Sequence, residues 1–224
     1  ADKKQALAGV HRIVVIPPFF GTPTLLGDDP AEKRKKRPAP KLSPEKRKEW
    51  DTYREYLQKL EQEAEKLLPT RLAKRTRWEV LPKETLKDAL KTLELSPQQL
   101  FENKGYLKGT KFPPAHKDHL IALAKETKAD AFLLTMLDEP LKITGGVVSD
   151  GFNLYYETPQ VRLRGNFIVV LADGKTLLSE AMEVVNPYTK RGNREYLLTD
   201  WQDAQAKLFE NFMDELNRYT PPPP

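Results

Sequence analysis

The order of its ordered segments is the feature that most constrains this chain: strand, helix, strand, helix, strand, strand, strand, helix. The apolar run His11–Phe19 opens the series and is typical of a strand buried on both faces. Strands joined by helices pair in parallel, whereas strands joined by loops or tight turns pair antiparallel. The order therefore predicts an α/β (α+β) fold, with a single mixed β-sheet of about five strands and helices packed on it.

A hairpin over Gln160–Val185 is the clearest local pattern. Apolar residues alternate with Arg162, Arg164 and Asn166 along its first strand, and Asp173-Gly174 is a favoured hairpin turn. Ahead of the hairpin, the sequence predicts a strand over Asp130–Ile143 and a glycine-bearing loop over Thr144–Gly151. The last three strands should therefore be antiparallel.

Helical periodicity is strong in two segments. Trp50–Leu68 carries a one-sided apolar stripe, and Pro69 predicts that this helix either kinks or restarts through Thr70–Arg75. The last helix is expected from about Asp200, where Thr199 and Gln202 have the spacing of a capping box. Its predicted buried stripe consists of Trp201, Ala204, Leu208, Phe212 and Leu216. We expect a single α/β domain over residues 10–220, followed by a proline tail at 221–224.

Residues 21–49 are predicted to be a basic, proline-rich insertion within this domain. Pro30–Lys48 holds nine Lys or Arg against two Glu, a net charge of +7 in a chain of net charge +5, so the rest of the chain carries about −2. The cluster Lys33, Arg34, Lys35, Lys36 and Arg37 could bind nucleic acid, anionic lipid or an acidic protein. A solvated linker is the alternative, because charge runs beside prolines are commonly disordered.

A second candidate surface lies around Thr144–Tyr156 and on the hairpin. Tyr155 and Tyr156 could anchor a protein partner, or could cover the edge of the sheet. Arg162 and Arg164 lie on the outward face of the hairpin strand, where they could form a recognition patch or keep that face soluble.

The sequence contains no recognisable catalytic set. Without cysteine, it has no disulfide, no thiolate nucleophile and no sulfur ligand for zinc. His116 and His119 could hold a metal with Asp118 or Glu126, but no third ligand is placed by spacing. Two exposed polar residues in the first turn of a helix are the simpler interpretation. We therefore predict no catalytic residue, no cofactor and no metal site.

The amino terminus bears on location. The chain begins Ala-Asp-Lys-Lys without a methionine, as a mature secreted protein cut after a small residue would, although a cytosolic location is the alternative. No apolar run approaches the roughly 20 residues that span a bilayer.

Four segments together resemble a bacterial envelope domain. They are Ile13–Phe19, Leu67–Leu93, Leu123–Leu137 and Phe167–Met182, which include the phrases IVVIPPF, AKETKADAFLLTML and VVLADGKTLLSEAM. Their order is similar to that in the domain shared by the amino-terminal part of TolB, the curli secretion lipoprotein CsgG and the peptidoglycan-synthase activator LpoB. The resemblance covers most of the chain outside Gly21–Lys66. It implies a non-enzymatic binding or assembly module of the bacterial envelope.

The functional prediction combines the motif order with the absence of a catalytic set. The chain is predicted to be a periplasmic or otherwise envelope-associated module that binds another envelope protein. The alternative is a cytosolic nucleic-acid-associated protein that uses the basic arm 33–48 for affinity. The sequence leaves the oligomeric state open.

Overall fold

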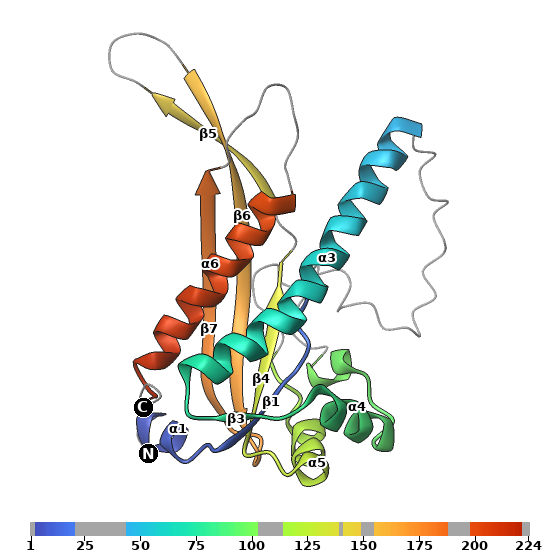
Figure 1. Ribbon diagram of the computed structural model, residues 1–224, viewed down its shortest axis with the longest axis vertical. Helices are drawn as coiled ribbons and strands as arrows, with labels where there is room; N and C mark the ends of the chain where they lie inside the picture. The colour runs from blue at the N-terminus through green and yellow to red at the C-terminus, as the bar shows by residue number, and fades with distance from the viewer. Residues whose placement is uncertain are drawn as a thin grey trace.

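The described residues form a mixed sheet of seven strand segments with helices packed on it (Figure 1). In this computed structural model, residues 3–20, 44–102, 114–138, 141–148, 155–187 and 198–220 are described. β1 (Arg12–Val15) pairs in parallel with both β3 (Glu79–Val80) and β4 (Ala131–Leu137). β2 (Phe19–Phe20) continues beside β4, also in parallel, beyond the Pro17-Pro18 break. The predicted parallel neighbours are confirmed.

The antiparallel half of the sheet is built around β6 (Tyr155–Leu171). β4, β5 (Leu141–Val148) and β7 (Thr176–Pro187) all pair antiparallel with it. Residues 165–170 of β6 pair with both β4 and β7, and residues 160–162 pair with both β5 and β7. β4 and β5 therefore follow one another along the same side of β6, and the segments occupy five positions across the sheet. The prediction of one mixed sheet of about five strands is confirmed.

Among the described elements, α1 (Lys3–Ala8), α3 (Pro44–Arg75) and α6 (Leu198–Asn217) cover one face of the sheet (Figure 1). Their apolar residues share a core with alternate residues of β6, because successive side chains of a strand point to opposite faces. The fully buried members of this core include Leu60, Ala64, Leu68, Leu72, Val161, Leu163, Phe167, Val169, Leu208, Phe209 and Phe212.

The opposite face is covered by α4 (Lys83–Thr92) and α5 (Lys117–Thr127), which are linked through the short 3-10 helix η1 (Pro97–Leu100). A second core forms there around Leu90, Leu120, Leu123, Phe132, Leu134, Ile168 and Val170. Because Ile168 and Val170 lie in this core, the C-terminal part of β6 is buried on both faces.

The predicted loop over Thr144–Gly151 is wrong for residues 144–148, which belong to β5. Val147 and Val148 have high strand propensity, and pairing with β6 outweighs the cost of Gly145 and Gly146. Residues 149–151 lie outside the described part of the chain. The predicted strand Asp130–Ile143 divides into β4 and the start of β5.

α3 begins earlier than the predicted Trp50–Leu68 helix and ends at Arg75, where the predicted kinked or restarted segment also ends. It begins at Pro44, where proline is tolerated because the first helical turn leaves the backbone N–H groups unpaired in any case. The last residues of the predicted insertion, 44–49, are therefore helical. α3 also continues through Pro69 to Arg75. The buried stripe of Leu60, Ala64, Leu68 and Leu72 runs across the proline, so packing on the sheet holds the helix together there.

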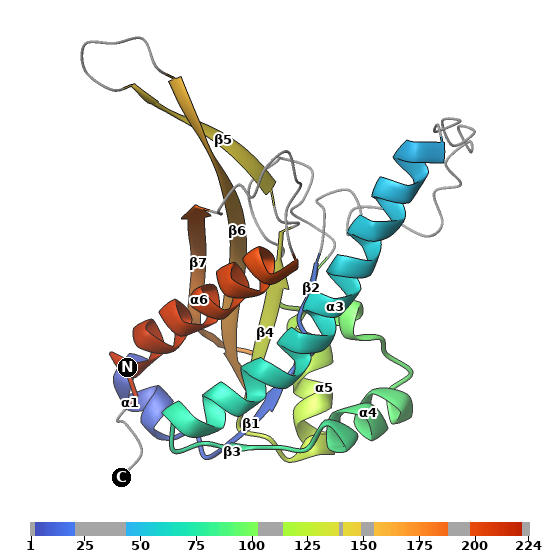
Figure 2. The same ribbon diagram turned by 45° about the horizontal axis from the view of Figure 1, so that its top comes forward.

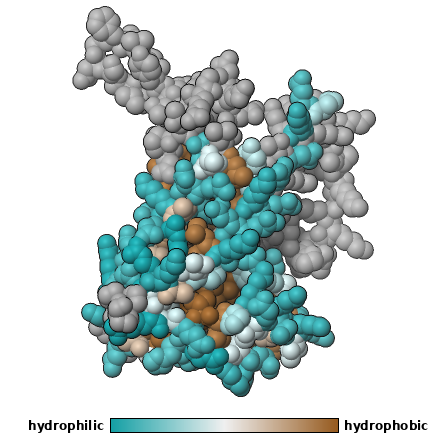
Figure 3. Space-filling model, viewed as in Figure 1, coloured by the Kyte–Doolittle hydropathy of each residue, from teal (hydrophilic) through white to brown (hydrophobic). Residues whose placement is uncertain are grey.

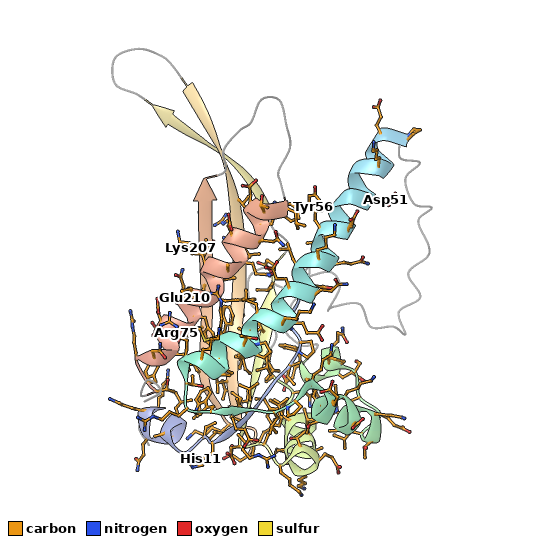
Figure 4. All side chains as sticks on the ribbon, viewed as in Figure 1. His11, Asp51, Tyr56, Arg75, Lys207 and Glu210 are labelled. Carbon is orange, nitrogen blue, oxygen red and sulfur yellow. The ribbon has the colours of Figure 1, made fainter. Side chains whose placement is uncertain are left out.

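α6 begins at Leu198, so Thr199 lies inside the helix and not at the predicted capping position. All five residues of its predicted stripe are buried. α6 lies against α3 through an edge-to-face contact of Tyr56 with Trp201, whose ring centroids are 5.8 Å apart. Figure 4 shows Arg75 and Glu210 directed toward each other across the two helices, where they form an ion pair. In Figure 3 the outer faces of these helices are hydrophilic, and apolar residues are visible between them.

Asp130 fastens the start of β4 to β1. Its Oδ2 accepts the backbone N–H of His11 at 2.9 Å and that of Arg12 at 2.8 Å, while its own N–H donates to the Arg12 carbonyl. Two main-chain donors at the entry to β1 are satisfied by one carboxylate oxygen. The Asp in the ADAFLL phrase is therefore a structural residue that aligns the first and third strands.

One end of the sheet extends beyond the helices as a two-stranded ribbon. β7 ends at Pro187, opposite Gln160, whereas β5 and β6 continue together to the Val148–Tyr155 pair. We call residues 144–148 and 155–159 the β5–β6 arm. Both Figure 1 and Figure 2 show it projecting past the tip of β7, at the same end of the molecule as the start of α3.

Candidate protein-binding surface

Two arginines on β6 converge on one carboxylate of β7, next to the base of the β5–β6 arm. Arg164 Nε donates to Glu183 Oε2 at 2.6 Å, and Arg162 Nε lies 2.9 Å from the same oxygen. In the strand register, Arg164 is opposite Glu183 and Arg162 is opposite Val185. We call Arg162, Arg164, Glu183 and Val185 the arginine patch.

The arginine patch is exposed because the second core covers one part of this face of β6 and does not extend to Arg162 and Arg164. Arg162 and Arg164 lie on the face that also carries Ile168 and Val170, which are 3% and 0% exposed in the second core. The side chains of Arg162 and Arg164 are 31% and 43% exposed, and Val185 is 39% exposed. Val185 is thus an exposed large apolar side chain. The sheet face is therefore open to a partner at the end where the arm begins.

The charges of the patch do not cancel, since two guanidiniums share one carboxylate. Interaction with Arg162, and next with Arg164, lowers the pKa of Glu183 below its usual value. The carboxylate therefore stays ionised at neutral pH, and the patch keeps a net charge of +1 by counting its three charged groups.

Glu183→Gln is expected to remove a small, pH-dependent part of the stability. A lowered folded-state pKa stabilises the protein above the unfolded pKa of about 4.3, and this contribution is lost as the pH falls through the folded pKa. Because the pair is solvent-exposed, the difference between wild type and variant should stay below about 1 kcal/mol at neutral pH and low salt. Urea unfolding near pH 7 and near pH 3 measures it. An equal difference at both pH values would contradict the ion-pair contribution.

Tyr155 and Tyr156 lie at the far end of the arm, within β6 and not in a loop. Their strand partners on β5 are Val148 and Val147. The structure thus places the two tyrosines and the two arginines along one strand, from the end of the arm to its base. The basic cluster Lys33–Arg37 lies outside the described residues, so its role stays a prediction.

His116 and His119 have structural roles at the start of α5. His116 caps the helix by accepting the backbone N–H of His119 at Nδ1, and the two rings stack with centroids 3.7 Å apart. His119 Nδ1 lies 2.7 Å from the Gln99 carbonyl and so ties α5 to η1. Within the described ranges, no three His, Asp or Glu side chains are grouped closely enough to hold a metal ion.

The polar side chains buried in the described core are uncharged threonine, asparagine and glutamine residues. Gln205 is an example, because its Nε2 donates to the Leu60 carbonyl and joins α6 to α3. Among the helices that the structure describes, none combines the length and apolar character needed to cross a membrane.

Sequence reasoning found Arg162 and Arg164 but missed Glu183 and Val185. Val170 pairs with Thr176 next to the Asp173-Gly174 turn. If the hairpin continued from this pair without a bulge, Met182 would lie opposite Arg164. A bulge between Val169 and Val170 shifts the register by one residue and brings Glu183 there instead. The apolar alternation of Met182 and Val184 was the available signal, because those side chains pack on the face that α1, α3 and α6 cover.

No family model and no curated protein matches this chain. Among solved structures, it is similar to the hypothetical protein CT253 from Chlamydia trachomatis, with 9% identity and a TM-score of 0.45, over 94% of this chain and 98% of that one. It is also similar to the LpoB C-terminal domain from Salmonella enterica, with 14% identity and a TM-score of 0.36, over 81% and 90% of the two chains. For lipoprotein GNA1162 from Neisseria meningitidis the values are 14% and 0.34, over 90% and 99%. These likenesses are too distant to transfer a function.

Proposed function

We propose that this protein is a non-enzymatic, envelope-associated module that binds another envelope protein or assists an assembly. The observation that carries the proposal is the β5–β6 arm with the arginine patch at its base. A two-stranded ribbon is marginally stable alone in water, so an arm beyond the sheet gains stability from a partner. Two arginines beside an exposed valine on an open sheet face suit a protein interface.

The sequence supports the envelope part of the proposal. The resemblance to the TolB, CsgG and LpoB domain rests on the order of the sequence segments, and the described strands follow that order with the parallel strands first and the antiparallel hairpin last.

Cell fractionation followed by site-specific crosslinking tests the proposal. A photoreactive amino acid at position 156 in the arm or at position 185 in the patch should crosslink to a protein in the envelope fraction of the native cells. The same group at exposed Lys91 on α4 serves as the matched control and should give no such product. A cytosolic location, or equal crosslinking from position 91, would contradict the proposal.

A further inference from the structure

We infer that the arginine patch recognises carboxylates on an extended acidic segment of the protein partner. This inference rests on the proposed function and adds the chemistry of the partner. It gives Glu183 and Val185, which the sequence analysis did not single out, a part in that recognition.

The spacing of the two arginines favours an extended ligand. Arg162 and Arg164 are two residues apart on β6 and flank the buried Leu163, so both lie on the open face. Alternate residues of a strand are about 7 Å apart, which is also the spacing of alternate side chains in an extended peptide. A segment with Asp or Glu at every second position therefore matches the two guanidiniums.

Both arginines are ion-paired with Glu183 through their Nε atoms. Arg164 donates its Nε–H to Glu183, whereas Arg162 Nε is ion-paired with the same oxygen at 2.9 Å without a hydrogen bond; the Nη groups form the rest of each planar fork. Arginine forks bind carboxylates through two parallel N–H bonds, which are stronger than bonds between neutral groups. Because Glu183 neutralises only one of the two positive charges, the patch still attracts an anion.

Val185 favours a protein segment over a free anion. It lies directly opposite Arg162 in the register and is exposed on the same face. An apolar contact beside charged hydrogen bonds suits a peptide that carries both aliphatic and acidic side chains.

The test measures binding of a fluorescent peptide of alternating Glu and Ser to the full chain at physiological salt. The variant Arg162→Gln/Arg164→Gln is expected to bind about tenfold more weakly than wild type, because it loses two charge-assisted contacts. The control Lys87→Gln/Arg218→Gln removes the same charge from exposed positions on α4 and beyond α6, and should change the affinity less than about twofold. This control distinguishes binding at the arginine patch from a general electrostatic attraction between the acidic peptide and a positively charged chain.

A third variant tests the fork itself. Arg162→Lys/Arg164→Lys keeps both charges but lacks the planar donor geometry, so it should bind clearly more weakly than wild type. Wild-type affinity in the Lys variant, or an equal loss in the Gln variant and its control, would overturn carboxylate recognition. Tighter binding to phosphatidylglycerol vesicles or duplex DNA than to the peptide, lost in the Gln variant, would assign the patch to those anions instead.

The failure of this inference is distinguishable from the failure of the proposed function. If crosslinks from position 185 persist while the Gln variant binds the acidic peptide as wild type does, the module binds a partner of different chemistry. If no envelope protein crosslinks from position 156 or 185, the proposed function itself fails.

Discussion

Replacing Phe167 with alanine is expected to lower the free energy of unfolding by about 3–5 kcal/mol. Phe167 is fully buried on β6, where its ring stacks on Phe212 of α6 with centroids 4.3 Å apart. It also meets Phe209 edge-to-face at 6.0 Å. Alanine removes both ring contacts and leaves a cavity between the sheet and α6 that the rigid strand cannot close.

Urea unfolding followed by circular dichroism measures this loss. Val185→Ala is the matched control, because it removes methyl groups from the neighbouring strand at a position that is 39% exposed. The control should change the free energy of unfolding by less than about 0.5 kcal/mol. Phe167→Leu should fall between the two, since it refills part of the cavity. Equal effects of Phe167→Ala and Val185→Ala would show that this core does not determine the stability.

Replacing Gly165 with valine is expected to destabilise the protein by about 1–3 kcal/mol, although valine favours strands. A Cβ at Gly165 would lie 3.0 Å from Cδ2 of both Leu137 and Leu208 and 3.2 Å from Cε2 of Phe167. These distances are shorter than ordinary van der Waals contacts, so α6 must move away from the sheet or side chains must leave their preferred rotamers.

The effect of Gly165→Val can be separated from strand propensity with Ser179→Val. Ser179 lies at an exposed position of β7, where a branched side chain has room. Thermal unfolding should show a clearly lower midpoint for Gly165→Val and a midpoint within a few degrees of wild type for Ser179→Val. A Gly165→Val midpoint equal to that of wild type would mean that α6 does not pack closely on β6.

Much of the antiparallel half could be predicted, because its signals are local. The Asp173-Gly174 turn forms as expected, with Gly174 at φ +80° and its N–H donated to the Leu171 carbonyl. The alternation along β6 also places Val161, Leu163, Phe167 and Val169 in the core. Turn chemistry and side-chain alternation depend on neighbouring residues, which a sequence displays directly.

The strand over residues 144–148 could not be predicted in the same way, and the sequence did not decide whether the helix kinks at Pro69 or restarts after it. Glycine and proline act locally as breakers, but β6 pairs with the glycines of β5, and the sheet packs against α3 on both sides of Pro69. In each case, a contact with residues far away in sequence outweighs the local preference.

The candidate site shows the same division. Arg162 and Arg164 were predicted on the outward face, because they alternate with apolar residues on one strand. Their shared partner Glu183 depends on a one-residue bulge, and a shift of one residue turns every side chain of β7 to the other face.

The sequence by itself determined the mixed sheet, its parallel and antiparallel halves and the hairpin, since these follow from periodicity and connection length. Only the tertiary structure decided which face each helix covers, how far the β5–β6 arm extends and which carboxylate meets the two arginines. The physical reason is that such features depend on register and packing between distant segments, whose energies no local pattern encodes.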